Sequence, residues 1–217
     1  MSEGDVDEPR TERVSRRRLL AAARRSFVAR GYGGTSLDAI IDEVGGSRRN
    51  IYTEFGGKDG LLRAVMREII EEIAAEAETL AATVADEPRE WLVAVGLPFV
   101  RRVLDPESIA VLRQLIAVGA PDEEIATLWR AGPERFRATL ATWLRAQHAS
   151  GRLRVPDPDA AAAMLPEMLR GGLHLELLLG RRQAVPEDEL RRQVERAVAL
   201  FLAALEPPPR ARRRAKR

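Results

Sequence analysis

Apolar residues recur with the three- and four-residue spacing of an α-helix along nearly the whole chain. No long stretch alternates apolar with polar residues, as a half-buried strand would, and the helix-favouring residues alanine, leucine, arginine and glutamate dominate. A chain of 217 residues with 45% hydrophobic content can also bury a substantial core. We therefore expect an all-α protein with about nine or ten helices in total.

Glycine clusters divide the first part of the chain into short segments. They follow residues 30, 44 and 55, at points where a helix can end in a tight turn. Three short helices are predicted, over 15–30, 37–44 and 48–55.

The remainder of the chain is organised as longer helices. An amphipathic helix is expected first, over 59–84, because its apolar residues are spaced by three, four or seven. Prolines then mark further helix starts, since a proline in the first turn needs no backbone N–H. The predicted helices cover 87–104, 106–119, 122–131, 133–150, 158–180 and 186–205.

The stretch SRRNIYTEF, over 47–55, combines a helix cap with a polar outer face. Ser47 is placed to cap the helix, and Ile51 and Phe55 fall together on its inward face. Arg49 and Thr53 fall on the opposite face, where such side chains can reach base edges and phosphates. With the preceding helix and its glycine turn, this arrangement indicates a helix-turn-helix unit, although a solvated basic helix in an ordinary bundle would show the same pattern.

The charge is distributed unevenly along the chain. Residues 1–9 carry a net charge of −4, 10–58 carry +6, 59–205 carry −5 and 206–217 carry +5. Because lysine and arginine neutralise phosphates, the basic 10–58 region is predicted to contact nucleic acid. The acidic 1–12 segment and the basic 206–217 segment are expected to be disordered tails.

One long stretch of sequence, RRLLAAARRSFVARGYGGTSLDAIIDEVGGSRRNIYTEFGGKDGLLRAVM, resembles the amino-terminal domain of the TetR/AcrR family of bacterial transcriptional regulators. The resemblance includes Phe27, Gly31, Tyr32, Gly45 and Lys58, together with the predicted helix over 48–55, here called the reading helix. It implies a ligand-responsive dimer that binds a palindromic operator, with repression as the family default.

The resemblance also implies contacts with DNA for particular residues. Phosphate contacts are implied for Thr35, Tyr52 and Lys58. Major-groove contacts are implied for Arg48, Arg49, Asn50 and Thr53, and Ser47 completes the predicted DNA-binding set as the helix cap.

Two positions depart from the family pattern. Gly46 stands where a small aliphatic residue is usual, and should loosen the turn. Glu54 stands where an aromatic residue or histidine is common. Its carboxylate can pair with a neighbouring arginine or accept a hydrogen bond from a cytosine amino group, and the ion pair is the simpler interpretation.

The larger region over 59–205 is expected to bind an effector and to form the dimer. Its stretch RAGPERFRATLATWLRAQHASGRLRVPDPDAAAAMLPEMLRGG resembles a regulatory domain of the same family. Bulky residues here can be plain core or can line a pocket for an unknown, largely apolar small molecule. The candidate pocket residues are Phe99, Trp129, Phe136, Trp143 and Met168, with Met164 as a further bulky residue.

The last two predicted helices are the candidate dimer interface. An apolar stripe on the final helix includes Leu190 and Ala197, and its predecessor carries a pair of small residues that would let two backbones approach. The resemblance implies a four-helix bundle across a twofold axis. The predicted interface residues are Gly171, Gly172, Leu173, Leu177, Val194, Val198, Phe201 and Leu205.

Several classes of function find no support in the sequence. The chain has no cysteine, and its two histidines, His148 and His174, lack metal-ligand spacing, so neither a metal nor a cofactor is expected. The GGKDG stretch around Lys58 lacks the Ser or Thr and the preceding strand of a phosphate loop, so we do not expect an enzyme. We expect a cytoplasmic protein without a membrane span.

These observations predict a helix-turn-helix domain over 13–58 followed by a helical effector-binding and dimerisation domain over 59–205. The expected function is sequence-specific transcriptional regulation, most simply repression that a small molecule relieves. A DNA-binding or architectural protein without sequence preference is the alternative. It would bind every duplex equally and with a strong salt dependence.

Overall fold

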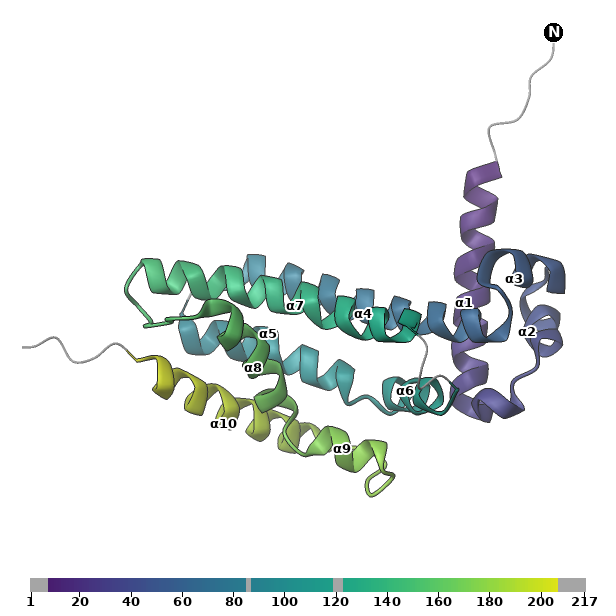
Figure 1. Cartoon of the computed structure of the whole chain (residues 1–217). Helices are drawn as coiled ribbons and strands as arrows, with labels where there is room; N and C mark the ends of the chain where they lie inside the picture. Colours follow the sequence, from purple (N-terminus) through teal and green to yellow (C-terminus); the bar gives the residue numbers. More distant parts are fainter. Residues whose placement is uncertain (1–7, 85–86, 119–122, 207–217) are drawn as a thin grey trace, which may run out of the picture.

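The computed structural model describes residues 8–84, 87–118 and 123–206 (Figure 1). Within these ranges, only the backbone is described for 8–15, 118 and 123–133. All regular elements in these residues are helices, which confirms the all-α prediction. None of the described helices is long and apolar enough to cross a bilayer. The ten helices are α1 (Glu8–Gly34), α2 (Leu37–Val44), α3 (Arg48–Phe55), α4 (Lys58–Thr83), α5 (Pro88–Val103), α6 (Pro106–Val118), α7 (Glu123–Ala149), α8 (Pro158–Arg170), α9 (Leu173–Leu178) and α10 (Glu187–Leu205).

The first helix is longer than the glycine and charge patterns predict. It begins at Glu8 rather than at residue 15, and so includes 8–12, which we expected to belong to a disordered tail. Pro9 suits a first helical turn, and the arginines and glutamates that follow favour helix. The rest of the predicted acidic tail and the basic tail beyond Glu206 lie outside the described residues.

Two predicted helix boundaries are wrong because tertiary packing overrides the local preferences of proline and glycine. Residues 123–149 form one helix across Pro133, instead of two helices that meet there. Proline lies inside two other helices as well, at Pro98 and Pro166, so tertiary packing compensates for the lost backbone hydrogen bond. Conversely, the segment over 158–180 is not continuous, because Gly171 has a φ of 52° and ends α8.

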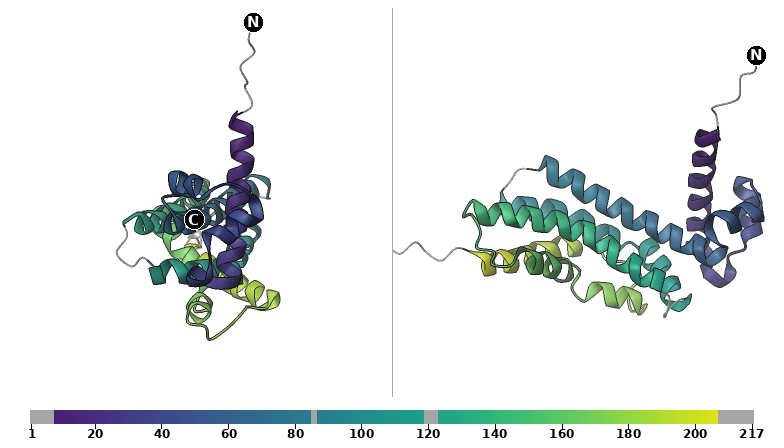
Figure 2. Two further views of the ribbon diagram at one scale, coloured as in Figure 1. Left: turned by 90° about the vertical axis from the view of Figure 1, so that its right-hand side faces the viewer. Right: turned by 45° about the horizontal axis from the view of Figure 1, so that its top comes forward.

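Helices α1, α2 and α3 form a head at one end of an elongated molecule, and the other helices form its body (Figure 1). Helix α4 begins in the head and runs along the body beside α7, while α1 stands across their direction (Figure 2). The head therefore presents α3 at the end of the molecule opposite to the last residues of α10 (Figure 1).

Two separate hydrophobic clusters stabilise the molecule. The first, here called the head core, includes Phe27 of α1, Ile40 of α2 and Ile51 of α3. It also includes Leu61 and other residues of the first turns of α4, and three residues of α6, namely Val111, Leu112 and Leu115. The predicted domain boundary between 58 and 59 thus falls inside a continuous core.

The second cluster, the body core, is built from α5, α7, α8 and α10. Aromatic pairs stack within it, with ring centroids 4.2 Å apart for Trp91 and Trp143 and 4.1 Å apart for Phe99 and Phe136. Such pairs add stability beyond the apolar area that they bury.

Candidate nucleic-acid interface

Helix α3 is held by its inward face and leaves its outward face exposed. Ile51 and Phe55 are buried in the head core, whereas Arg49, Asn50 and Thr53 are exposed, as the sequence predicts. Gly56 ends the helix in the left-handed conformation at φ 73°, where glycine has no steric cost. The exposed side chains carry hydrogen-bond donors and acceptors that suit the edges of bases.

Ser47 caps α3 as predicted. Its Oγ accepts a hydrogen bond from the backbone N–H of Asn50 at 3.2 Å, and its hydroxyl lies 3.0 Å from Asn50 Oδ1. The cap satisfies one of the four N–H groups that a helix leaves free at its start.

Replacing Ser47 by alanine is expected to lower the free energy of unfolding by about 1 kcal/mol, because that N–H then loses its partner. Urea unfolding at a fixed pH would measure the change. The variant Ser47→Asp, which keeps a capping oxygen, is the control and should unfold close to the wild-type midpoint. Equal loss in both variants would contradict a capping role.

The turn between α2 and α3 depends on two glycines with positive φ. Gly45 has a φ of 81° and Gly46 a φ of 112°. Residues with a side chain rarely adopt a φ as large as that of Gly46. Gly46, which departs from the family pattern, is therefore required by the backbone conformation of this turn.

Arg48 is exposed but is not free to contact DNA with its whole guanidinium group. Its Nε donates to Asp38 Oδ1 at 2.5 Å, and its Nη2 donates to the other carboxylate oxygen of the same residue. These hydrogen bonds from Arg48 lower the pKa of the Asp38 carboxyl. The residue Asp38 was not predicted as part of the site, because ten positions separate it from Arg48 and no local pattern links them.

Glu54 forms an ion pair within the head. Its carboxylate lies 2.7 Å from Nε of Arg16 on α1, and the Arg16 guanidinium lies 5.4 Å from the centre of the Phe55 ring. Of the two interpretations open for Glu54, the ion pair is therefore the one that the structure contains.

Tyr52 and Lys58 lie at the end of the reading helix that leads into α4. Tyr52 is exposed, and the Lys58 ammonium lies 4.4 Å from the centre of the Tyr32 ring. The Tyr32 hydroxyl in turn donates to Asp59. Both predicted phosphate-contacting residues are thus near the surface, and their contact with DNA stays a prediction.

Thr35 does not fit its predicted phosphate contact. Its side chain is buried, and its hydroxyl donates to the Gly31 carbonyl at 2.8 Å and receives a hydrogen bond from Ser26 at 3.2 Å. Both hydrogen bonds stay inside the head, so this hydroxyl supports the bend between α1 and α2 instead of facing DNA.

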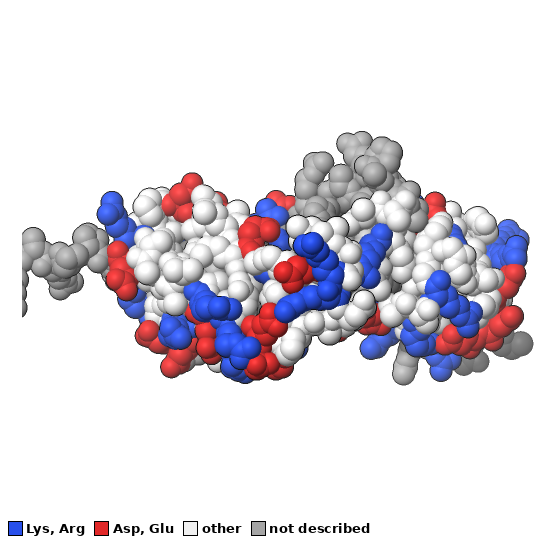
Figure 3. Space-filling model, turned by 90° about the horizontal axis from the view of Figure 1, so that it is seen from below, with Lys and Arg blue, Asp and Glu red and all other residues white. Residues whose placement is uncertain are grey.

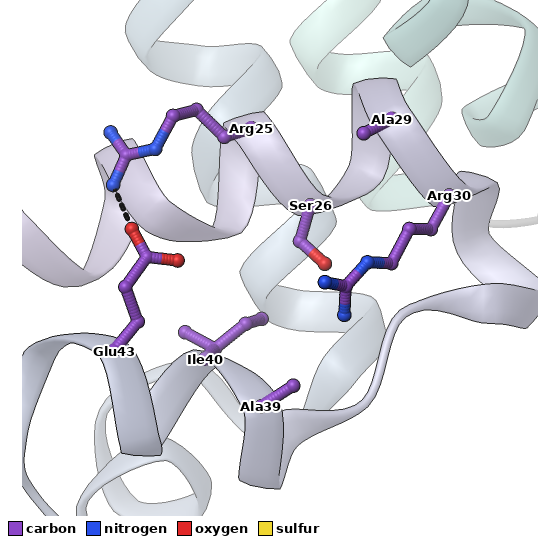
Figure 4. Close-up of a pocket in the computed structure, with 7 residues that line it drawn as sticks. All are labelled: Arg25, Ser26, Ala29, Arg30, Ala39, Ile40 and Glu43. Carbon is purple, nitrogen blue, oxygen red and sulfur yellow. Dashed lines mark hydrogen bonds and ion pairs between the residues drawn. The ribbon is translucent and has the colours of Figure 1, made fainter.

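A cavity of about 150 Å³ lies beside that bend, between α1 and α2 (Figure 4). Arg30 points into it near Ser26, and an ion pair between Arg25 and Glu43 closes the other end. The cavity is lined by residues of the head alone and is small for an organic effector.

The candidate effector residues are mostly core residues. The faces of the Phe99 and Phe136 rings are occupied by each other, and Trp143 stacks on Trp91. Met168 is half-buried against the same cluster, while Met164 is exposed. The side chain of Trp129 lies outside the described residues.

The predicted dimer stripe is directed into the protomer. Leu177, Val194, Val198, Phe201 and Leu205 are all buried in the body core, where α10 packs on α5 and α8, and Leu173 packs against the same core. The buried side chains of this set are occupied within the protomer, Leu173 is partly buried, and a contact of any of them with a second copy stays a prediction. Gly171 and Gly172 are exposed.

A different set of apolar residues is exposed on the same helices. Met164 on α8, Leu175 on α9 and Leu200 on α10 are 62%, 60% and 67% exposed, and Leu179 just after α9 is 65% exposed. In the view from below, uncharged surface covers much of the end of the body that leads to the C-terminus, and charged side chains gather towards the middle (Figure 3).

Comparison with known proteins agrees with both halves of the chain. Residues 19–65 match a family described as "Bacterial regulatory proteins, tetR family", and residues 90–207 match one described as "AefR-like transcriptional repressor, C-terminal domain". The chain is 30% identical to the HTH-type transcriptional regulator BetI of Stenotrophomonas maltophilia, over 74% of this chain and 80% of BetI. It is 28% identical to the HTH-type transcriptional repressor AcnR of Corynebacterium jeikeium, over 83% of this chain and 85% of AcnR.

Solved structures share the fold. A TetR-family transcriptional regulator from Mesorhizobium loti has a TM-score of 0.77 at 23% identity, with 90% of this chain and 98% of that chain covered. The flavonoid-responsive regulator FrrA has a TM-score of 0.59 at 25% identity, with 91% of this chain and 99% of that chain covered. Together with the exposed, capped reading helix, these matches show that the chain belongs to the TetR family and is a DNA-binding transcriptional regulator.

Proposed function

We propose that this regulator is a cytoplasmic repressor that binds a palindromic operator as a homodimer and is released by a small molecule that enters the body. The observation that carries the proposal is the exposed face of α3, where Arg49, Asn50 and Thr53 project from a helix anchored by Ile51 and Phe55. Two such helices about 34 to 36 Å apart would read successive major grooves on one side of the duplex. No catalytic step is part of this function.

The exposed apolar residues of α8, α9 and α10 support the position of the dimer interface. Met164, Leu175, Leu179 and Leu200 would each lose water contact against a second copy, and large apolar side chains exposed on neighbouring helices support an interaction surface. A twofold arrangement would place the same residues on both sides of the interface. We call this surface, Met164, Leu175, Leu179 and Leu200, the dimer face.

The aromatic stacks of the body core support the site of the effector. A flat, largely apolar molecule could replace one ring of the Phe99–Phe136 pair only if the helices that carry the rings separate. FrrA, which shares the fold, is described as flavonoid-responsive, and an aromatic effector would suit these stacks. Such binding would favour a body conformation different from the DNA-binding one.

Contacts between the head and the body support the coupling. The Arg24 guanidinium on α1 donates to Glu107 on α6 at 2.8 Å and lies 3.3 Å from Glu72 on α4. Gln114 on α6 also donates to the Phe27 carbonyl at 2.7 Å. A shift of α6 or α4 would therefore move α1 and the spacing of the reading helices. A coupling free energy of about 1 to 3 kcal/mol would change operator affinity roughly 5- to 150-fold.

Selection of bound fragments from a random duplex pool would test the proposed function. We expect enrichment of one palindrome, bound at least about 10³-fold more tightly than random DNA at a fixed salt concentration. Equal affinity for all duplexes would instead favour the alternative of DNA binding without sequence preference. A small molecule that binds the body tightly and leaves operator affinity unchanged would contradict the proposed release mechanism.

A further inference from the structure

We propose that Asp38 sharpens sequence specificity by positioning Arg48, so that Arg48 adds fewer contacts that are independent of the DNA sequence. The inference rests on the proposed function, because it concerns the same reading helix. It assigns a role in DNA recognition to an acidic residue on α2.

The geometry of the pair is the first step. Nε and Nη2 of Arg48 both donate to the Asp38 carboxylate, one to each oxygen. This is one of the two two-donor edges with which a guanidinium can grip either the O6 and N7 atoms of guanine or a phosphate, the other being formed by Nη1 and Nη2. While Asp38 holds that edge, Arg48 can offer DNA only the edge formed by Nη1 and Nη2, so one of its two possible two-donor contacts is lost.

The neighbouring residue shows the contrast. Arg49 follows Arg48 directly, is exposed, and forms no ion pair with the part of the chain that the structure describes. Two adjacent arginines of α3 therefore differ in what they can give to a duplex. Among the described residues, nothing holds the guanidinium of Arg49 away from a base, whereas Asp38 holds one edge of Arg48.

The location of the carboxylate adds a second effect. Asp38 lies in the first turn of α2 and is exposed beside the reading helix, so it places negative charge close to where the phosphates would pass. Repulsion of this kind weakens binding to all sequences alike. An exposed ion pair is individually weak, so a duplex can displace it, but only by separating the two charges.

The consequence concerns the ratio of the affinity for the operator to the affinity for random DNA. Any duplex offers phosphates to a free Arg48, whereas only the operator offers the bases that Arg49, Asn50 and Thr53 read. Asp38 thus lowers affinity for random DNA more than affinity for the operator.

The test is Asp38→Asn in the full-length protein, measured by equilibrium binding to the selected operator and to a random duplex over a range of salt concentrations. We expect affinity for the random duplex to rise about 3- to 10-fold and the operator-to-random ratio to fall, because Arg48 gains a phosphate. The slope of the logarithm of the binding constant against the logarithm of the salt concentration should become steeper by about 0.9 for each added phosphate contact. Asp38→Glu, which keeps a carboxylate within reach of Arg48, should restore most of the wild-type ratio.

Two further variants separate positioning from simple loss of charge. Asp42 lies on the same helix, is exposed and forms no ion pair with the described residues, so Asp42→Asn removes an equal charge without freeing Arg48. It should change the ratio much less than Asp38→Asn. In an Arg48→Gln background, Asp38→Asn should have no more effect than Asp42→Asn.

The outcomes distinguish this inference from the proposed function. If Asp38→Asn and Asp42→Asn behave alike, or if the effect of Asp38→Asn persists without Arg48, the positioning role is overturned even though the operator is still recognised. If the wild-type protein shows no operator preference at all, the proposed function itself fails. Equal thermal unfolding midpoints across the variants would exclude a folding defect as the cause of any difference.

Discussion

Replacing both Leu175 and Leu200 by glutamate is expected to convert the protein from dimers to monomers and to lower operator affinity about 10²- to 10⁴-fold. Both leucines are exposed in the protomer and belong to the dimer face, so their replacement should not disturb the body core. Four buried carboxylates across a twofold interface would oppose association strongly. The loss follows because a monomer binds one half-site without the high effective concentration that a linked second head provides.

Sedimentation velocity and operator binding would measure this effect together. Ile116 on α6 is a large apolar residue of comparable exposure outside the dimer face, so Ile116→Glu is the matched control. It should leave both the oligomeric state and operator affinity near wild type. A double variant that remains dimeric would show that the dimer face lies elsewhere.

Replacement of Arg49 by alanine is expected to cost about 1 to 3 kcal/mol in each half-site, and hence at least about 30-fold in operator affinity for the dimer. Arg49 is the arginine of α3 whose guanidinium has no ion pair among the described residues. If it grips a guanine, its removal should also relax the preference for that base. Binding to operators with each base substituted in turn would measure both effects.

Lys58→Gln provides the contrast to Arg49→Ala. Lys58 lies beside the Tyr32 ring at the start of α4, where a phosphate contact is expected, so its loss should weaken operator and random DNA alike. Arg49→Ala should instead weaken the operator selectively. An Arg49→Ala protein with unchanged affinity and base preference would mean that the outward face of α3 does not enter the major groove.

The reading unit could be predicted closely because its signals are local. The period of Ile51 and Phe55, the capping position of Ser47 and the glycines of the turn lie within a few residues of each other, and the structure has α2 and α3 over the predicted residues. Helix periodicity determines which residues share a face, and a short helix with one apolar face has few ways to pack.

The contacts that could not be predicted depend on tertiary structure. Periodicity identified the apolar stripe of α10 but not its partner, and Val198 and Phe201 pack on their own protomer. Burial of the Thr35 hydroxyl requires the bend after Gly31, and the pair of Arg48 with Asp38 requires the relative orientation of two helices. Contacts of this kind depend on how helices that are distant in the sequence pack against each other.

The head core has a consequence for how this regulator can be divided. Helix α6, which the chain reaches only after crossing the body, supplies Val111, Leu112 and Leu115 to the apolar interior around the reading helix. A fragment cut after residue 58 would leave that interior open to solvent, so the DNA reader is not an autonomous cassette that can be transplanted onto another sensor. Body and reader therefore form one physical unit, and a substitution at one of these α6 residues would disturb the packing of both.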